Sequence, residues 1–332
     1  MARICSVIAS SHSPFLFKPQ EWWNQVRDAR ARTVHNPVDS DEDNARKLAR
    51  TRAAMGTLRD IFQRSRPDVC LIFGDDQDEQ FGLSNLPAFA VYAGGEFEGY
   101  RELAYAGVPG SRSLLPKNNE TWAKVAARPD LARDLLESLL RSGFDPAFML
   151  SLPNPAHGMG HAFMRPLGSL TDGRFDVPAL PVMVNCFYAP QPTAARCVAV
   201  ARAIRKTIEA WPETIRVAVI GSGGLWHTPG APDAYINQEF DQAILEGIRA
   251  GDTDRLADYF DHWQPGAAFA HLRCYQSFSG GTRMIGGIGS GTGETRNWIM
   301  AAAIADRPGV VVGYVPVYAS PCGMGFAHWD MQ

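Results

Sequence analysis

The sequence lacks the features of membrane, secreted and nucleic-acid-binding chains. It has no apolar run long enough to span a bilayer, and the N-terminal stretch MARICSVIASSHSPFLF is too short and too polar for a signal peptide. Its 32 basic and 35 acidic residues give a formal net charge of -3, without a long basic stripe. We therefore expect neither a membrane nor nucleic acid as a partner.

Cysteine pairs and phosphate-binding loops are also missing. The six cysteines are scattered and form no C-x-x-C pair, which excludes a zinc knuckle and a dithiol redox motif. With no secretory signal, this pattern fits reduced thiols in a cytoplasmic protein. The glycine-rich segments GSGGLWH and GGIGSGTGETRNW contain no G-x-G-x-x-G, no G-x-x-x-x-G-K-[ST] and no G-x-S-x-G. Nucleotide binding and α/β-hydrolase chemistry thus lack their specific signals.

What is present is an ordinary globular composition, with 45% hydrophobic and 20% charged residues, and alternating strand and helix patterns. Continuous apolar, β-branched runs predict buried strands at Ile4–Ile8, Val69–Phe73, Pro181–Val184, Val217–Ile220 and Val310–Val317. Helical spacing predicts helices at Asp43–Arg64, Pro129–Arg141, Thr193–Ala210, Asp233–Ala250 and Glu294–Ala305. The alternation predicts an α/β fold with a central, mostly parallel sheet flanked by helices.

The length of 332 residues is compatible with a single catalytic domain over residues 1–332. Between about residues 81 and 159 the periodicity weakens, and glycine, proline and aromatic residues accumulate. Such a stretch is typical of a long excursion that lines or covers a pocket.

Two predicted strands end in polar segments that are candidates for a site, because ligands of α/β sheets gather beyond the carboxyl ends of the strands. His12 follows the first strand in SSHSP, and it is either a turn histidine or a ligand. The second strand ends in FGDDQDEQF, whose four carboxylates surround Gln77. They either face solvent, or a cation relieves their mutual repulsion.

Three further segments carry candidate side chains. In NPAHGMGHAFMRPL, the glycines between His157 and His161 argue against a continuous metal-binding helix, so we expect a loop that presents His161. His227 closes the glycine-rich turn GSGGLWH after another strand. Glu239 lies on a predicted helix beside the apolar stripe of Ile236, Phe240 and Ile244, where it is either exposed or partnered.

Taken in order, SSHSP, the strand followed by DDQ, GHAFMRPL, GSGGLWH and NQEFD resemble the class III extradiol ring-cleavage dioxygenases, exemplified by the catalytic subunit of protocatechuate-cleaving enzymes. The segments GSGTGETRNW and YVPVYASPCGMGFAHW are similar to the closing part of that family. The resemblance implies a non-haem iron enzyme, with another divalent metal possible, that cleaves a catechol-like or aminophenol-like ring with dioxygen.

By this resemblance, His12, Gln77 and Glu239 correspond to the metal ligands, His161 to the acid/base histidine and His227 to a second catalytic histidine of the pocket. His157 is expected to contact the substrate. A neutral imidazole at His161 could take a proton from a phenolic hydroxyl and return it later.

The sequence departs from the family at Gln77, where the family has a metal-binding histidine. An amide oxygen is a harder and weaker donor than imidazole, so Asp76 or Asp78 is an alternative third ligand. The departure leaves two other functions open: a metal-dependent hydrolase or C–C lyase on the same scaffold, and a non-catalytic subunit. The resemblance further implies either a homodimer or a complex with a small subunit.

Overall fold

The computed structural model describes residues 1–29, 36–82, 84–105, 113–188, 190–227, 235–263, 274–276, 283–285 and 290–331. The core of the molecule is a sheet whose strands run in the order β11-β12-β1-β8-β2-β7-β3-β6. These strands are β1 (Arg3–Ser10), β2 (Val69–Gly74), β3 (Phe89–Tyr92), β6 (Ala147–Met149), β7 (Ala179–Val184), β8 (Arg216–Ser222), β11 (Val310–Val317) and β12 (Cys322–Trp329). Two small hairpins stand apart: β4 (Glu96–Tyr100) with β5 (Trp122–Ala126), and β9 (Cys274–Gln276) with β10 (Arg283–Ile285).

The middle of the sheet is parallel and its margins are mixed. Strands β1, β8, β2 and β7 are neighbours and run parallel to one another, as do β3 and β6, whereas the β1–β12, β11–β12 and β3–β7 pairs are antiparallel. This arrangement confirms the α/β fold with a mostly parallel sheet. It also places the carboxyl ends of β1, β8 and β2 side by side, since Ser10 pairs with Ser222 and Phe73 with Gly221.

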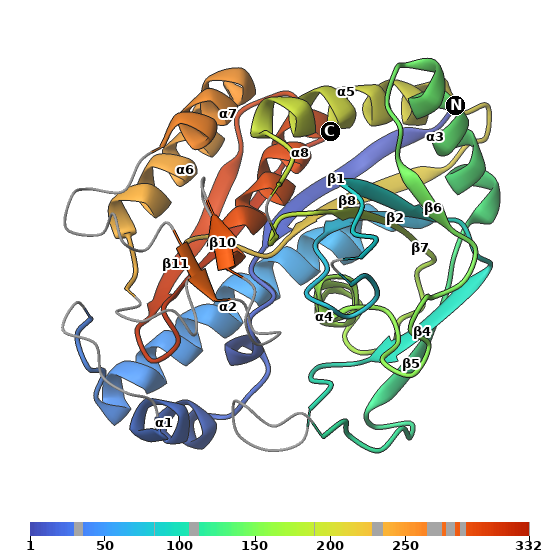
Figure 1. Cartoon of the computed structure of the whole chain (residues 1–332). Coiled ribbons are helices and arrows are strands. Elements are labelled where there is room, and N and C mark those ends of the chain that lie inside the picture. Colours follow the sequence, from blue (N-terminus) through green and yellow to red (C-terminus); the bar gives the residue numbers. More distant parts are fainter. Residues whose placement is uncertain are drawn as a thin grey trace.

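Helices cover both faces of the sheet (Figure 1). They are α1 (Gln20–Ala29), α2 (Asp41–Ser65), α3 (Pro129–Arg141), α4 (His161–Leu170), α5 (Ala194–Ala210), α6 (Gln238–Ala250), α7 (Thr253–His262) and α8 (Thr295–Ala305), with short 3-10 turns η1 (Pro14–Leu16) and η3 (Ser290–Glu294). In the part of the chain that the structure describes, no helix combines the length and apolarity needed to cross a membrane.

Alternation along the strands divides the apolar side chains between two cores. In β2, Val69, Leu71 and Phe73 join the core under α3, α5, α6, α7 and α8, whereas Cys70 and Ile72 join the core under α1, α2 and α4. Successive residues of a strand point to opposite faces, so a strand buried on both sides must be apolar at every position. This is why the run Val69–Phe73 was readable as a central strand.

The expected strands and helices are present, and most differ by no more than two residues at their ends. The helix expected from Asp233 begins only at Gln238, and Asp233 itself lies outside the described residues. The expected loop presenting His161 is different: a helix begins there, with Gly160 as its N-cap residue and Pro166 inside it. The segment 81–159 is also more regular than expected. It supplies β3 and β6 to the main sheet, together with the β4–β5 hairpin and α3.

Asp241 gives the fold a testable pH dependence. It is fully buried on α6, and its carboxyl group accepts hydrogen bonds from the Trp226 N–H and the Tyr314 hydroxyl, both at 2.6 Å. Burial raises its pKa from 3.8 to about 8. Because the folded state binds this proton more tightly than the unfolded chain, the free energy of unfolding should fall as the pH rises through that range.

Urea denaturation at pH 5 and pH 8 measures this effect. The Asp241→Asn variant keeps the shape of the side chain but has no titratable group. Its free energy of unfolding should therefore fall less between the two pH values than that of the wild type. Equal decreases in both proteins would remove Asp241 as a source of the pH dependence.

Candidate functional site

The site lies at the edge of the sheet where β1, β2 and β8 end. His12 is two residues beyond β1 and Asp75 directly follows β2, so the parallel register brings them together. Helix α4 adds His161, and it approaches β2 so closely that a side chain on Gly74 would meet Ala162 and Phe163 at 3.0 Å. Ligand atoms of His12, Asp75 and His161 all lie within 4.8 Å of one another.

His12 is buried and presents one ring nitrogen to the cluster. Its Nδ1 shares a hydrogen bond of 2.9 Å with Ser222 Oγ at the end of β8, and its Nε2 lies 3.5 Å from Glu294 Oε2 without a hydrogen-bond partner. Burial lowers the pKa of His12 to about 4, so the imidazole is neutral at pH 7. A neutral, oriented imidazole with an unpartnered nitrogen is suited to bind a metal.

Glu294 supplies the carboxylate beside His12. It is the last residue of η3, is fully buried, and accepts hydrogen bonds from the Gly224 N–H at 2.7 Å and from Gln77 Nε2 at 2.9 Å. Gly223 has a φ of 109°, and a Cβ there would lie 2.3 Å from Glu294 Oε2. The turn after β8 therefore needs glycine to admit this carboxylate.

Two buried carboxylates face each other across Gln77. Burial raises the pKa of Asp75 to about 7, and the neighbouring Glu294 adds to the shift; burial likewise raises the pKa of Glu294 to about 7. The amide nitrogen of Gln77 donates to Asp75 Oδ2 and to Glu294 Oε1, each at 2.9 Å. Repulsion between the carboxylates favours either protons or a cation at this point.

His161 is fixed by a second carboxylate. Glu79 Oε1 lies 2.7 Å from His161 Nδ1 and accepts the His161 backbone N–H at 3.0 Å. Burial alone would raise the pKa of Glu79, but His161 holds it at about 2. A Cβ on Gly160 would lie 2.3 Å from Glu79 Oε2, so the N-cap glycine leaves room for the pair.

Glu239, expected as a metal ligand, is not brought to this cluster. It lies exposed in the first turn of α6, and Glu294 occupies the position beside His12. The alternative ligands also differ from expectation: Asp76 accepts the backbone N–H groups of Gln80 and Phe81, and Asp78 is exposed. The buried carboxylates of the cluster are therefore Asp75 and Glu294.

The other two expected histidines lie on separate segments. His157 is buried, its ring centroid is 6.2 Å from that of Tyr100 and 5.9 Å from that of Tyr105, and neither ring nitrogen has a hydrogen-bond partner. His227 is half-buried, and its backbone pairs with Thr292, two residues before Glu294. Its ring lies against Gly291, where a Cβ would meet it at 2.5 Å.

Arg165 fixes the backbone at His12 through a hydrogen bond. It is buried on α4 and donates to the backbone oxygens of His12, at 3.0 Å, and Glu102. Arg296 is likewise occupied by backbone, with bonds to the oxygens of Pro192 and Gly293. These two guanidinium groups therefore stabilise the backbone around the site.

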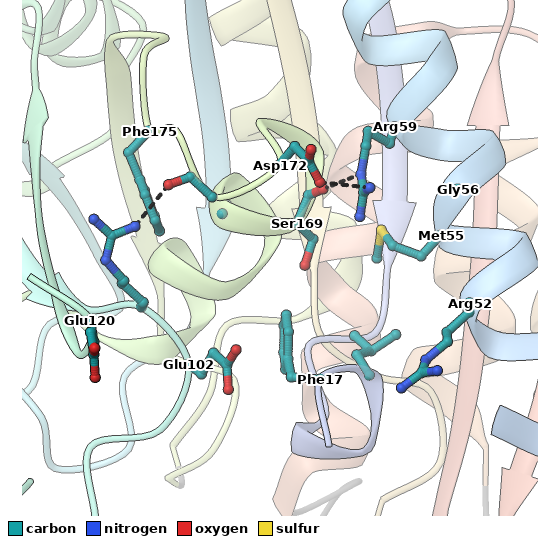
Figure 2. Close-up of a pocket in the computed structure, with 14 residues that line it drawn as sticks. Phe17, Arg52, Met55, Gly56, Arg59, Glu102, Glu120, Ser169, Asp172 and Phe175 are labelled. Carbon is teal, nitrogen blue, oxygen red and sulfur yellow. Dashed lines mark hydrogen bonds and ion pairs between the residues drawn. The ribbon is translucent and has the colours of Figure 1, made fainter. Parts of the chain in front are cut away.

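A pocket of about 570 Å³ lies between α2 and α4 (Figure 2). Figure 2 shows Arg59 joined to Asp172 and to the backbone oxygen of Ser169 on its wall. None of the clustered side chains lines this pocket, but Glu102 does, and its backbone oxygen accepts from Arg165. It is a separate depression that shares one supporting residue with the site.

Comparison with known proteins identifies the family of the chain. The profile of the family described as "Catalytic LigB subunit of aromatic ring-opening dioxygenase" matches residues 37–276, which is most of the chain. The chain belongs to this family. The match includes Asp75 and His161, whereas His12 and Glu294 lie outside the matched residues.

The matches to individual LigB-type relatives are partial. A gallate dioxygenase from Pseudomonas putida is 31% identical over 40% of this chain and 38% of its own length. A 2,3-dihydroxyphenylpropionate/2,3-dihydroxicinnamic acid 1,2-dioxygenase from Photorhabdus laumondii is 26% identical over 57% of this chain and 55% of its own length. An enzyme of the same name from Mycobacterium sp. (strain MCS) is 26% identical over 72% of this chain and 69% of its own length. The chain thus spans 38% of the length of the gallate dioxygenase and 55% of the length of the Photorhabdus enzyme.

Sequence reasoning singled out Asp75 and Glu79 only as members of the acidic group around Gln77, and it missed Ser222 and Glu294. A signal for Glu294 was available, because most of the helix that follows it, TRNWIMAAAIA, is apolar, as is typical of a buried helix. A carboxylate at the start of an entirely buried helix is itself inside the protein and needs a partner.

Proposed function

We propose that the chain is an extradiol-type dioxygenase that cleaves a catechol-like or aminophenol-like aromatic ring. The observation that carries the proposal is the buried cluster at the ends of β1 and β2, where two imidazoles and two carboxylates meet in a chain of the LigB family. The aromatic compounds with adjacent hydroxyl groups that are named for the relatives indicate the class of substrate to try first.

The residues of the cluster fit a divalent metal ion. His12 Nε2 and Asp75 Oδ1 are buried polar atoms that lack hydrogen-bond partners, a cost that a bound cation would remove. His12 and Glu294 would hold the metal, with the Asp75–Gln77 pair on a third side. Iron(II) is our proposed ion; when bound, it supplies the redox chemistry that joins dioxygen to the ring.

His161 is the proposed acid/base residue. Because the Glu79 carboxylate lies 2.7 Å from its Nδ1, the proton is held on that nitrogen and Nε2 remains the basic atom. The His161 ring packs edge-on against His12, with centroids 4.5 Å apart, so it stands beside the metal position. From there Nε2 can take a proton from a phenolic hydroxyl and return it as the ring opens.

His157 and His227 are proposed to act on the substrate. His157 is only 7% exposed, its ring packs near those of Tyr100 and Tyr105, and neither of its ring nitrogens has a hydrogen-bond partner. A polar group of a bound ring would satisfy one of these nitrogens. We assign His227 as the second catalytic histidine, because its backbone N–H donates to Thr292 in the turn that ends at Glu294.

We further propose that the protein works in the cytoplasm, as a homodimer or with a small partner subunit. The described cysteines Cys5, Cys70, Cys186, Cys197 and Cys322 are free thiols, as expected in a reducing compartment. For assembly, the edge strand β6 leaves Phe148 63% exposed, and Leu150 just beyond it is 69% exposed. Apolar side chains at a sheet edge favour contact with another chain.

Oxygen consumption by the iron-loaded protein tests the activity. Gallate, protocatechuate, 2,3-dihydroxyphenylpropionate and 2-aminophenol are the probes. We expect equimolar loss of dioxygen and of aromatic absorbance with at least one of them, and none with His12→Ala. Turnover of a probe without oxygen uptake would instead support a hydrolase or lyase. Absence of bound metal and of turnover would support a non-catalytic subunit.

A further inference from the structure

Gln77 occupies the position where the sequence resemblance places a metal-binding histidine, but its side chain already makes two hydrogen bonds. Its amide nitrogen has two hydrogens, and both are donated: one to Asp75 Oδ2 and one to Glu294 Oε1. Turning the amide around would bring its oxygen against two carboxylate oxygens, which repel it. The Gln77 amide nitrogen therefore positions the carboxylates of Asp75 and Glu294.

Asp75 has the free ligand atom that Gln77 lacks. Its side chain is fully buried, Oδ2 is occupied by Gln77, and Oδ1 has no hydrogen-bond partner. A ligand atom of Asp75 lies within 4.8 Å of one of His12, whose Nε2 is also buried and unpartnered. A divalent cation between these two atoms would satisfy both of them, since no hydrogen-bond partner in the described chain does.

We propose that Asp75, and not Gln77, is the third metal ligand, so that one imidazole, from His12, and two carboxylates, from Asp75 and Glu294, hold the ion. Gln77 is then a positioning residue that fixes both carboxylates through one amide group. The inference rests on the proposed function only in assuming that a divalent metal binds here.

The second imidazole of the cluster, that of His161, is more exposed to solvent than that of His12. The His161 side chain is 17% exposed, compared with 3% for His12, and its Nδ1 is bound by Glu79. This placement suits proton transfer to a substrate that enters from outside. The proposed ligand set thus contains a single imidazole.

The ligand set has a consequence for metal preference. Two carboxylates neutralise a divalent cation and offer it hard oxygen atoms, which suit Mn²⁺ as well as Fe²⁺. A site with two imidazoles and one carboxylate favours Fe²⁺ more strongly. We therefore expect Mn²⁺ to bind here with an affinity close to that of Fe²⁺.

Anaerobic calorimetric titration of the full chain with Fe²⁺ and with Mn²⁺ tests the proposal through two variants. Gln77→Leu removes every ligand atom at position 77; it should still bind metal, with an affinity about 10–100-fold lower, as for residues that support a ligand. Asp75→Asn keeps the size of the side chain and should bind at least about tenfold more weakly than Gln77→Leu. Circular dichroism confirms that each variant is folded.

The opposite order of affinities overturns the proposal. If Asp75→Asn fails to fold, Gln77→Leu decides alone, because complete loss of metal in that folded variant makes Gln77 the ligand. X-ray absorption of the Mn²⁺-loaded wild type provides an independent reading, with one imidazole expected and two excluding the proposed set. Metal binding without oxygen uptake would defeat the proposed dioxygenase function and leave this ligand assignment standing.

Discussion

Replacing His161 with asparagine is expected to lower kcat by about 10²–10⁴-fold, the usual contribution of a positioned acid/base group. Asparagine can keep a hydrogen bond to Glu79, but it cannot accept and return a proton. Because His12, Asp75 and Glu294 remain, the affinity for metal should change little. Steady-state oxygen consumption and calorimetric metal titration of the same preparation measure the two effects.

A variant of Glu79 sharpens this test. In Glu79→Gln, the partner of His161 Nδ1 is neutral, so the ring stays in place but loses the carboxylate that stabilises its protonated form. We expect kcat to fall less than in His161→Asn, with KM little changed. If His161→Asn loses its metal as well as its activity, His161 is a ligand together with His12 and Asp75, and the acid/base assignment fails.

Most of the fold could be predicted from the sequence because its central elements are simple. Strand β2 is apolar at every position and α5 repeats its apolar residues at helical spacing, so each pattern has one interpretation. Helix α4 was missed because Gly158, Gly160 and Pro166 interrupt the pattern. The structure resolves the conflict by ending the turn at Gly160 and starting the helix at His161.

The site was harder to predict than the fold because it is assembled by close approach between distant segments. His12 and His161 were recognised from their motifs, and the structure brings them together. The position of Glu294 depends on Gly223 and on the packing of α8, and the local sequence of these segments does not show that they meet beside His12. Local sequence showed which residues could be ligands, but tertiary packing determined which carboxylate faces His12.

The helix that carries Glu239 shows how a sequence pattern can mislead. Ile236, Phe240 and Ile244 form the buried stripe of α6 and the segment before it. At about 100° per residue, Glu239 is turned away from the middle of that stripe and reaches solvent. A carboxylate beside a buried stripe in sequence is thus not necessarily beside it in space.

Glu294→Gln is expected to abolish measurable metal binding and oxygen uptake, whereas Glu239→Gln should leave both at the wild-type level. The two substitutions make the same chemical change, removal of one negative charge without loss of volume, at a fully buried and an exposed position. At position 294 the amide replaces an anionic ligand that lies 3.5 Å from His12 Nε2, and its NH₂ group faces Gln77 or Gly224, which are also donors. Leaving donors face to face in the interior adds a further penalty.

Metal content after dialysis against iron(II), together with the melting temperature of the apo and loaded forms, measures this difference. The wild type and Glu239→Gln should melt at a higher temperature when metal is present, because a ligand that binds only the folded state stabilises it. Glu294→Gln should show no such increase. If Glu239→Gln loses the metal-dependent increase and Glu294→Gln keeps it, the carboxylate ligand is on α6, and the metal position proposed beside His12 is wrong.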